Sequence, residues 1–401
     1  LNEVEVVIEA TGFPAAGIEH ARQAFQNGKH IIMVNVEADV LAGAALAKEA
    51  NSVGVVYSMA YGDQPALTAE IIEWARASGF NVTSAGKGTR YQPIYHKSSP
   101  DTVWDYYGLT HEEARKAGMN PKMFNSFLDG TKSGLEMAAI ANACDLEVPT
   151  NGLLFPPCGM DDLANILKPL EFGGLLEKNG QVEVVSSLER DGRPVFKDLR
   201  WGVYAVLEAP NDYAASCFKQ YGMNTDDTGK YSAMYKPFHL IGMELNISVF
   251  SAALLKQATG QTKKFTGDVV STTKKNLKKS EILDGEGGAT VWGKLVPSKL
   301  SLSMEALPIG LAHGIKLKNE IDQFKLKENS SLPHFHKNGK VTWLSVSKSY
   351  ENLIEFIQNL RCWVIPSYGY EDIDAIVRQG NNELTEKILE TFDGVYFRWV
   401  S

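Results

Sequence analysis

The chain has 401 residues, of which 44% are hydrophobic and 22% charged, and its formal net charge is −8. This composition is typical of a globular protein and leaves room for two or three domains. The acidic balance argues against a nucleic-acid surface, which needs clustered Lys and Arg. No apolar run approaches the ~20 residues that a membrane span needs. We therefore expect neither a nucleic acid nor a membrane as a partner.

The number and spacing of the cysteines indicate whether the protein works in a reducing or an oxidising cellular compartment. They show no CxxC pair and no dense, even spacing, and they lie at Cys144, Cys158, Cys217 and Cys362. Such sparse cysteines favour a reducing compartment in which each thiol is a small buried side chain. No signal-peptide pattern opens the sequence. These features predict a cytoplasmic protein.

The first 90 residues alternate between apolar strand patterns and helical patterns. Strands are expected at 4–10, 30–35, 54–58 and 80–85, and helices at 14–27, 41–51 and 65–78. This alternation is typical of parallel crossover units, whose ligands bind beyond the carboxyl ends of the strands. The sequence therefore predicts an α/β fold that begins with a partial Rossmann-type parallel sheet. We expect all four strands to share that sheet and to form one cleft.

A dinucleotide site normally opens with a strand and a G-x-G-x-x-G turn. No such turn is present, and the sequence begins at Leu1 directly in a strand pattern. We interpret residues 1–90 as an NAD(P)-binding domain whose N-terminal half is missing from this sequence.

The rest of the chain divides into three further units. Residues 91–260 combine long loops, a helix at 134–144 and strands at 181–188 and 203–208 that look antiparallel, which indicates an α+β substrate or catalytic domain. Residues 261–325 have short strands and Lys-rich turns and predict a small β-rich module. Residues 331–401 are rich in aromatic side chains and predict a small α/β unit of unknown role.

Candidate ligand-binding residues gather at the predicted strand ends. We expect these positions to bind the cofactor: Thr11, Gly12, Asn35, Glu37, Gly62 and Asp63. For the glycines the alternative is plain turn geometry, which needs no ligand. Lys87 lies between two glycines after the fourth strand, where we expect it to polarise a carbonyl or to bind a phosphate. Its alternative is a solvated lysine in a turn.

A second group of candidates lies in the middle of the chain. Lys122, Asp129 and Lys132 fall in one segment, and Asp129 and Lys132 are spaced to share a helix face. They are candidates for holding substrate hydroxyls and a phosphate, the alternative being a surface ion pair. His239 is a candidate for proton transfer, although lone histidines are more often structural. No metal signature is visible, and carboxylates from separate segments converging on Mg²⁺ or Mn²⁺ stay an open alternative.

Several motifs resemble known families. The strand and turn at 7–12, with Gly28-Lys29-His30 and Val34-Asn35, resemble the cofactor domain of homoserine dehydrogenases. A longer resemblance, over residues 1 to about 320, is to the 1-deoxy-D-xylulose-5-phosphate reductoisomerase-like oxidoreductases. It is carried by VNVEAD at 34–39, AYGDQP at 60–65, AGKGT at 85–89, MNPKMFNSFLDGTK at 119–132, FPPCG at 155–159, LERDGRP at 188–194 and MYKPFHLIGME at 234–244.

This resemblance implies a homoserine-dehydrogenase-like NAD(P)-binding domain, a separate catalytic domain and a C-terminal module of the SAF type. It implies NADP(H) as cofactor and inhibition by fosmidomycin. The implied reaction converts 1-deoxy-D-xylulose 5-phosphate to 2-C-methyl-D-erythritol 4-phosphate in isoprenoid biosynthesis. We expect a small phosphorylated substrate and a homo-oligomer. Two alternatives stay open, namely a homoserine-dehydrogenase-like oxidoreductase and a non-catalytic cofactor sensor or scaffold.

Overall fold

The computed structural model describes residues 4–321, and the expected α/β unit at 331–401 lies outside the described residues. Three sheets organise this part of the chain. One has three strands, one has four and one has two. In the described part, no helix combines the length and the apolar character that crossing a membrane requires.

The first sheet is parallel, as the sequence predicts. Its strands run in the order β1 (Val6–Glu9), β2 (His30–Met33) and β3 (Tyr57–Met59). Each strand leads into a helix, and these are α1 (Pro14–Gln26), α2 (Val36–Ser52) and α3 (Gln64–Ala77). Val6 pairs with His30 and Ile31 with Tyr57, so all three carboxyl ends lie at one edge of the sheet. The predicted partial Rossmann-type sheet is confirmed for these three strands.

The fourth predicted strand departs from the expectation. It forms β4 (Asn81–Thr89), which belongs to the second sheet and not to the first. It is also longer than predicted, so Lys87 lies inside a strand. Gly86 and Gly88 permit this arrangement, because a Cβ atom there would collide with the carbonyl oxygens of Glu183 and Leu199. The glycines therefore serve close strand packing and do not form a turn.

The second sheet is mixed and forms the centre of the α+β region. Its strand order is β5 (Gln181–Ser186), β4, β6 (Val203–Glu208) and β7 (Tyr231–Lys236). β5 runs parallel to β4, while β6 runs antiparallel to it. β5 and β6 therefore run antiparallel to each other, as expected from the sequence, with β4 between them. The helices of this region are α4 (Val103–Tyr107), α5 (His111–Lys116), α6 (Pro121–Leu128), α7 (Thr131–Cys144), α8 (Leu163–Ile166), α9 (Asp212–Gln220) and α10 (Asn246–Phe250).

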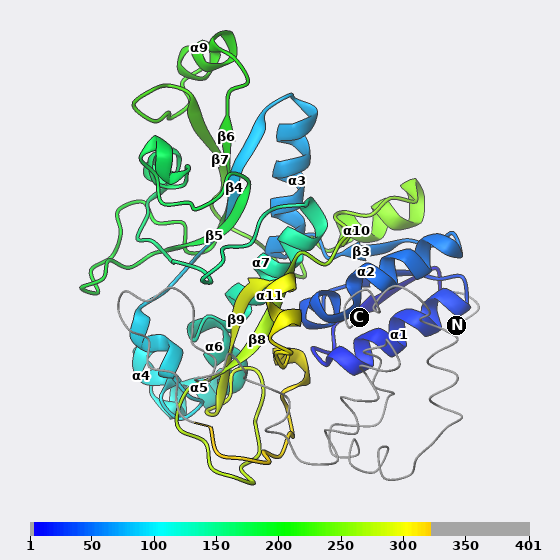
Figure 1. Cartoon of the computed structure of the whole chain (residues 1–401). Helices are drawn as coiled ribbons and strands as arrows, with labels where there is room; N and C mark the ends of the chain where they lie inside the picture. Colours follow the sequence, from blue (N-terminus) through cyan, green and yellow to red (C-terminus); the bar gives the residue numbers. More distant parts are fainter. Residues whose placement is uncertain (1–3, 322–401) are drawn as a thin grey trace.

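The last described unit is a two-stranded antiparallel sheet. It consists of β8 (Gly267–Thr273) and β9 (Val291–Pro297), followed by α11 (Ser298–Ser303). In Figure 1 the two strands lie beside α7, close to the centre of the molecule. The expectation of an α/β fold with a mixed region and a small β-rich unit is thus confirmed.

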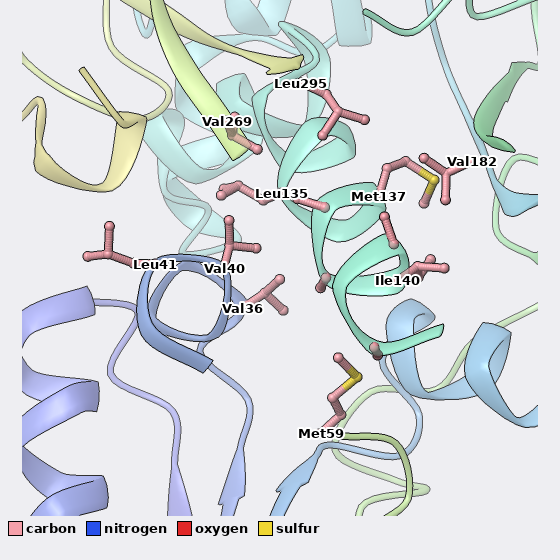
Figure 2. Packing of buried hydrophobic residues seen from close by; sticks show 14 of the residues in the cluster. Val36, Val40, Leu41, Met59, Leu135, Met137, Ile140, Val182, Val269 and Leu295 are labelled. Carbon is pink, nitrogen blue, oxygen red and sulfur yellow. The ribbon is translucent and has the colours of Figure 1, made fainter. Parts of the chain in front are cut away.

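Helix α7 joins the three parts into one hydrophobic core. Leu135, Met137 and Ile140 of this helix are almost fully buried. Figure 2 shows them among Val36 and Val40 of α2, Val182 of β5, and Val269 and Leu295 of the β8–β9 pair. Small residues such as Gly134 let the helix approach β9 closely. A polar side chain on α7 is therefore held at a fixed position against both larger sheets.

Candidate functional site

The strand-end turns are fixed by helix caps. The Asn35 side chain follows β2 and accepts a hydrogen bond from the backbone N–H of Ala38 (3.0 Å), which caps α2. Its amide also donates to the carbonyl of Phe13 (3.0 Å). Asp63 follows β3 and caps α3 by accepting from the backbone N–H of Gln64 (2.9 Å). These caps place the first residues of α2 and α3 at the same edge of the first sheet.

Lys87 reaches this edge from the second sheet. It is 6% exposed, and its ammonium forms an ion pair with Glu136 of α7. It also donates to the side-chain oxygen of Gln64 (3.0 Å). The alternative of a solvated lysine in a turn is therefore wrong. α3, β4 and α7 meet at this one ammonium group.

Lys132 forms a second ion pair beside the first. It lies one turn before Glu136 on α7, so both side chains share a helix face. Its ammonium is 2.7 Å from the carboxylate of Glu37, in the first turn of α2. We call the group of Glu37, Asp63, Lys87, Lys132 and Glu136 the strand-end cluster. The structure thus brings together four residues that the sequence proposes separately.

Two carboxyl groups at the cluster, those of Asp63 and the nearby Glu286, have raised pKa values. Burial, helped by the charge of Glu136, raises the pKa of Asp63 to about 6. Glu286, in the loop between β8 and β9, also belongs to this neighbourhood, and burial together with Glu37 raises its pKa to about 8. The carboxylates around Lys132 raise the pKa of its ammonium despite its burial. The cluster and its neighbour Glu286 therefore combine fixed ammonium groups with two carboxyl groups, those of Asp63 and Glu286, that titrate near neutral pH. Acid–base catalysis requires such groups.

Three further residues that the sequence predicts to bind the cofactor, Thr11, Gly12 and Gly62, lie outside the strand-end cluster. Thr11 and Gly12 are exposed at the end of β1, and Gly12 has a φ of +71° with open space around it. Gly62 has a φ of +94°, and a Cβ atom there would lie 2.9 Å from the Leu240 carbonyl oxygen. Gly62 therefore lets the 240–244 segment approach closely. Within that segment, Glu244 forms an ion pair with Lys236.

Two predicted catalytic residues in the middle of the chain lie apart from the cluster. Asp129 is fully buried, and its carboxylate pairs with Lys274 of the segment after β8 (2.7 Å). The expectation that Asp129 and Lys132 share a helix face is wrong, because Asp129 ends α6 and Gly130 separates it from α7. Lys122 donates to the backbone carbonyl of Asp284 (3.1 Å).

His239 lies at the border of the cluster. Its Nδ1 atom is 2.7 Å from the Trp201 carbonyl oxygen, and its charge when protonated lowers the pKa of Asp63. It is exposed. It is therefore close enough to Asp63 to act electrostatically, and it has access to solvent.

The i, i+4 spacing of Lys132 and Glu136 predicts that these two side chains share a helix face, as the structure shows. Two other members of this neighbourhood, Gln64 and Glu286, were missed as site residues. Gln64 and Glu286 carry no local signal, because only the packing of α3 and of the β8–β9 loop brings them to the lysines.

Cavities and metal ligands complete the description. A cavity of about 10 Å³ lies beside Asp63, lined also by Met33, Met59 and Ala139. A groove of about 720 Å³ lies elsewhere, between α2, the 261–265 segment and α11. Within residues 4–321, no three His, Cys, Asp or Glu side chains are arranged to hold a metal ion. The strand-end cluster therefore does not coincide with the groove between α2 and α11.

The middle of the chain is similar to a known protein family. Residues 62–245 match the family model described as "Oxidoreductase DRL, catalytic domain". This segment includes Asp63, Lys87, Lys132 and Glu136. The expectation of a catalytic region similar to that of an oxidoreductase is thereby confirmed in the middle of the chain. No curated protein matches the chain.

A solved structure is also similar. It is described as a "putative oxidoreductase" from Bacteroides fragilis NCTC 9343, with 14% sequence identity and a TM-score of 0.23. The likeness covers 65% of this chain and 73% of the other. So distant a match carries no argument about activity.

Proposed function

We propose that this protein is an NADPH-dependent oxidoreductase that reduces the carbonyl of a small phosphorylated, ketose-like substrate. The specific candidate reaction is the conversion of 1-deoxy-D-xylulose 5-phosphate to 2-C-methyl-D-erythritol 4-phosphate, in which the carbon skeleton first rearranges to a branched aldehyde and NADPH then reduces that aldehyde. The observation that carries the proposal is the strand-end cluster, whose two lysines and Asp63 lie within the segment that matches the oxidoreductase family.

The cofactor is assigned to the edge where β1 and β2 end. Thr11 and Gly12 are exposed there, and the open space around Gly12 permits close approach of a ligand. Next to them, the Glu9 Oε2 atom is buried without a hydrogen-bond partner among the described residues. These residues fit the ribose and nicotinamide side of a dinucleotide. When bound, the cofactor supplies a hydride, and the chain supplies position and electrostatics.

The strand-end cluster supplies the proton and the charge. Reduction of a carbonyl places negative charge on its oxygen, which a fixed ammonium stabilises most when it needs no rearrangement. Lys87 is held by Glu136 and Gln64 and is suited to that role. With its pKa at about 6, Asp63 exchanges protons near neutral pH. Glu37 fixes Lys132, which keeps a second positive charge beside Asp63.

The test is direct. The full chain is mixed with NADPH and 1-deoxy-D-xylulose 5-phosphate, and the absorbance of the reduced cofactor is followed. We expect substrate-dependent oxidation of NADPH that stops in the Lys87→Met variant. Oxidation no faster than without substrate would overturn the substrate assignment. Calorimetry showing no binding of NADPH would overturn the cofactor assignment and favour a non-catalytic role.

A further inference from the structure

Gln64 is the first residue of helix α3, and its side chain ends beside Lys87. It is 4% exposed, so its amide group is held among protein atoms. The Lys87 ammonium donates to the Oε1 atom of this amide (3.0 Å). An ammonium group has three N–H donors and no acceptor, so only the oxygen of an amide can face it. The contact with Lys87 therefore fixes which way round the Gln64 amide lies.

The nitrogen of this amide has no partner in the described part of the chain. Within residues 4–321, the Gln64 Nε2 atom donates to no acceptor, so both of its N–H groups are unused. The Nε2 atom is not enclosed either, in contrast to the Glu9 Oε2 atom, which is buried without a partner. Buried polar groups are almost always hydrogen-bonded. The Gln64 amide therefore has accessible donors for an acceptor that these residues do not supply.

Lys87 offers a second free donor next to the first. Its ammonium forms one ion pair with Glu136 and one hydrogen bond with Gln64, so its third N–H has no acceptor within residues 4–321. The Gln64 Oε1 atom accepts from this ammonium and shares a carbon atom with Nε2, so the two donor groups are neighbours. Neighbouring donors of this kind can bind one oxygen atom together, as the donors of an oxyanion hole do.

Three elements of secondary structure hold these donors in place. Lys87 lies inside β4 and its partner Glu136 in α7. On α3, the Asp63 side chain accepts from the backbone N–H of Gln64 (2.9 Å), and the Thr68 hydroxyl donates to the Gln64 backbone carbonyl (2.8 Å). The N-terminus of this 14-residue helix also places the positive end of its dipole at Gln64. Donors that need no rearrangement stabilise a developing negative charge most strongly.

Reduction of a carbonyl develops negative charge on its oxygen. When the hydride reaches the carbon, the π electron pair of the C=O bond moves to the oxygen, and a proton from the Asp63 carboxyl group completes the alcohol. We propose that the Gln64 amide donates a hydrogen bond to this oxygen together with Lys87, which makes Gln64 a catalytic residue. Because Glu136 neutralises Lys87, the amide adds stabilisation that the lysine alone does not supply. This inference rests on the proposed function, since it assigns a further donor to the same reaction.

Nuclear magnetic resonance tests the donor without turnover. The full chain carries ¹⁵N on its glutamine side chains, and the NH₂ signals of Gln64 and Gln261 are assigned from their absence in Gln64→Met and Gln261→Met. 1-Deoxy-D-xylulose 5-phosphate is titrated with NADP⁺ present, and hydroxyacetone, a bare hydroxy ketone, is titrated in parallel. We expect the Gln64 signals to shift and the Gln261 signals to stay, because Gln261 already donates to the Tyr57 carbonyl (3.0 Å). Unchanged Gln64 signals with both ligands overturn the proposal.

Kinetics of the same variants separate a donor from a purely structural residue. In Gln64→Met we expect kcat for the ketose phosphate to fall about a hundredfold while KM stays within about threefold, since a donor to the transition state is lost. Gln261→Met should leave both unchanged. Gln64→Glu keeps an acceptor for Lys87 and lacks the N–H groups, so it should lose turnover as well. Turnover near that of the wild type in Gln64→Glu would show that Gln64 acts only by holding Lys87, and it would overturn the proposal.

The donor role and the proposed reaction can fail separately. If the wild type oxidises NADPH with the ketose phosphate and kcat is unchanged in Gln64→Met, the donor role fails and the reaction stands. A rise in KM at unchanged kcat assigns the amide to substrate binding and also overturns its action on the reacting oxygen. If the wild type oxidises no NADPH with this substrate, the proposed reaction fails, and the hydroxyacetone titration still decides whether the Gln64 amide binds a carbonyl oxygen.

Discussion

The strand-end cluster and two arginines near the end of β4, Arg90 and Arg200, use positive charge in opposite ways. In the cluster, Lys87 and Lys132 are held by Glu136 and Glu37, and Lys87 is nearly inaccessible to solvent. At the end of β4, Arg90 and Arg200 are half-buried, and no ion pair to either is found within residues 4–321. Lys87 is thus a neutralised cation, whereas Arg90, just past the end of β4, donates only to the neutral hydroxyl of Tyr95 (3.4 Å) among the hydrogen bonds found within residues 4–321.

This difference shows that a positive charge can either be used to stabilise the fold or remain available to a ligand. A buried ion pair fixes geometry and tunes its neighbours, but it leaves little net charge for a ligand. A partly exposed cation without a partner retains its charge and loses little stability when it is removed. Variants of the two regions should therefore affect stability and binding in opposite proportions.

The largest effect should come from Lys87. Its replacement by Met leaves Glu136 buried without a counter-ion, which costs about 3–5 kcal/mol. We expect a strongly lowered free energy of unfolding in urea, together with loss of turnover. The Lys87→Met/Glu136→Leu double variant should recover most of the stability and none of the turnover. Equal stability of wild type and Lys87→Met would show that the ion pair contributes nothing to the fold.

The next effect concerns Asp63 and pH. Its pKa in the folded chain, about 6, lies above the usual value of 3.8, so the native state holds this proton more tightly than the unfolded chain. This group therefore lowers stability as pH rises from about 4 to about 6, by on the order of 2–3 kcal/mol. In Asp63→Asn that loss should vanish from urea melts taken across this range. The plot of kcat/KM against pH should also lose the change near pH 6 that titration of Asp63 causes. If that change persists in the variant, another group titrates there.

Lys294 gives an intermediate case, a buried cation for which residues 4–321 provide no carboxylate partner. It is 8% exposed, and burial lowers the pKa of its ammonium to about 8. The unfolded chain therefore binds more protons between pH 8 and about 10.5, so this group makes stability rise over that interval. Lys294→Met should raise the free energy of unfolding at pH 7 by about 1–3 kcal/mol. A destabilised variant would point to a partner for Lys294 outside the described residues.

The smallest effect on stability should come from Arg200. Arg200→Gln removes a like-charge contact and no ion pair, so unfolding at pH 7 should change by less than about 0.5 kcal/mol. The measurement is the same urea melt as for Lys87. A loss comparable to that of Lys87→Met would remove the distinction between the two regions and imply a structural role for Arg200.

Much of the fold could be predicted from local patterns. The three strands of the first sheet and their helices follow from apolar runs and turn residues, and the site residues Glu37, Asp63, Lys87 and Lys132 follow from their positions near strand and helix ends. The sheet membership of β4 could not be predicted, because its apolar pattern fits either sheet. The pairing of Asp129 with Lys274 was missed because 145 residues separate them. The domain boundaries, the cytoplasmic location, the homo-oligomeric state and the roles of the site residues stay predictions.

The sequence by itself determined which elements form and which strands end in polar turns, since both depend on residues that are close along the chain. Only the tertiary structure decided which charges meet. Helix α7 carries Lys132 to Glu37 of α2 and Glu136 to Lys87 of β4. The physical reason is that electrostatic partners are chosen by distance in space. Packing of the shared core fixes that distance, and no local pattern in the chain encodes it.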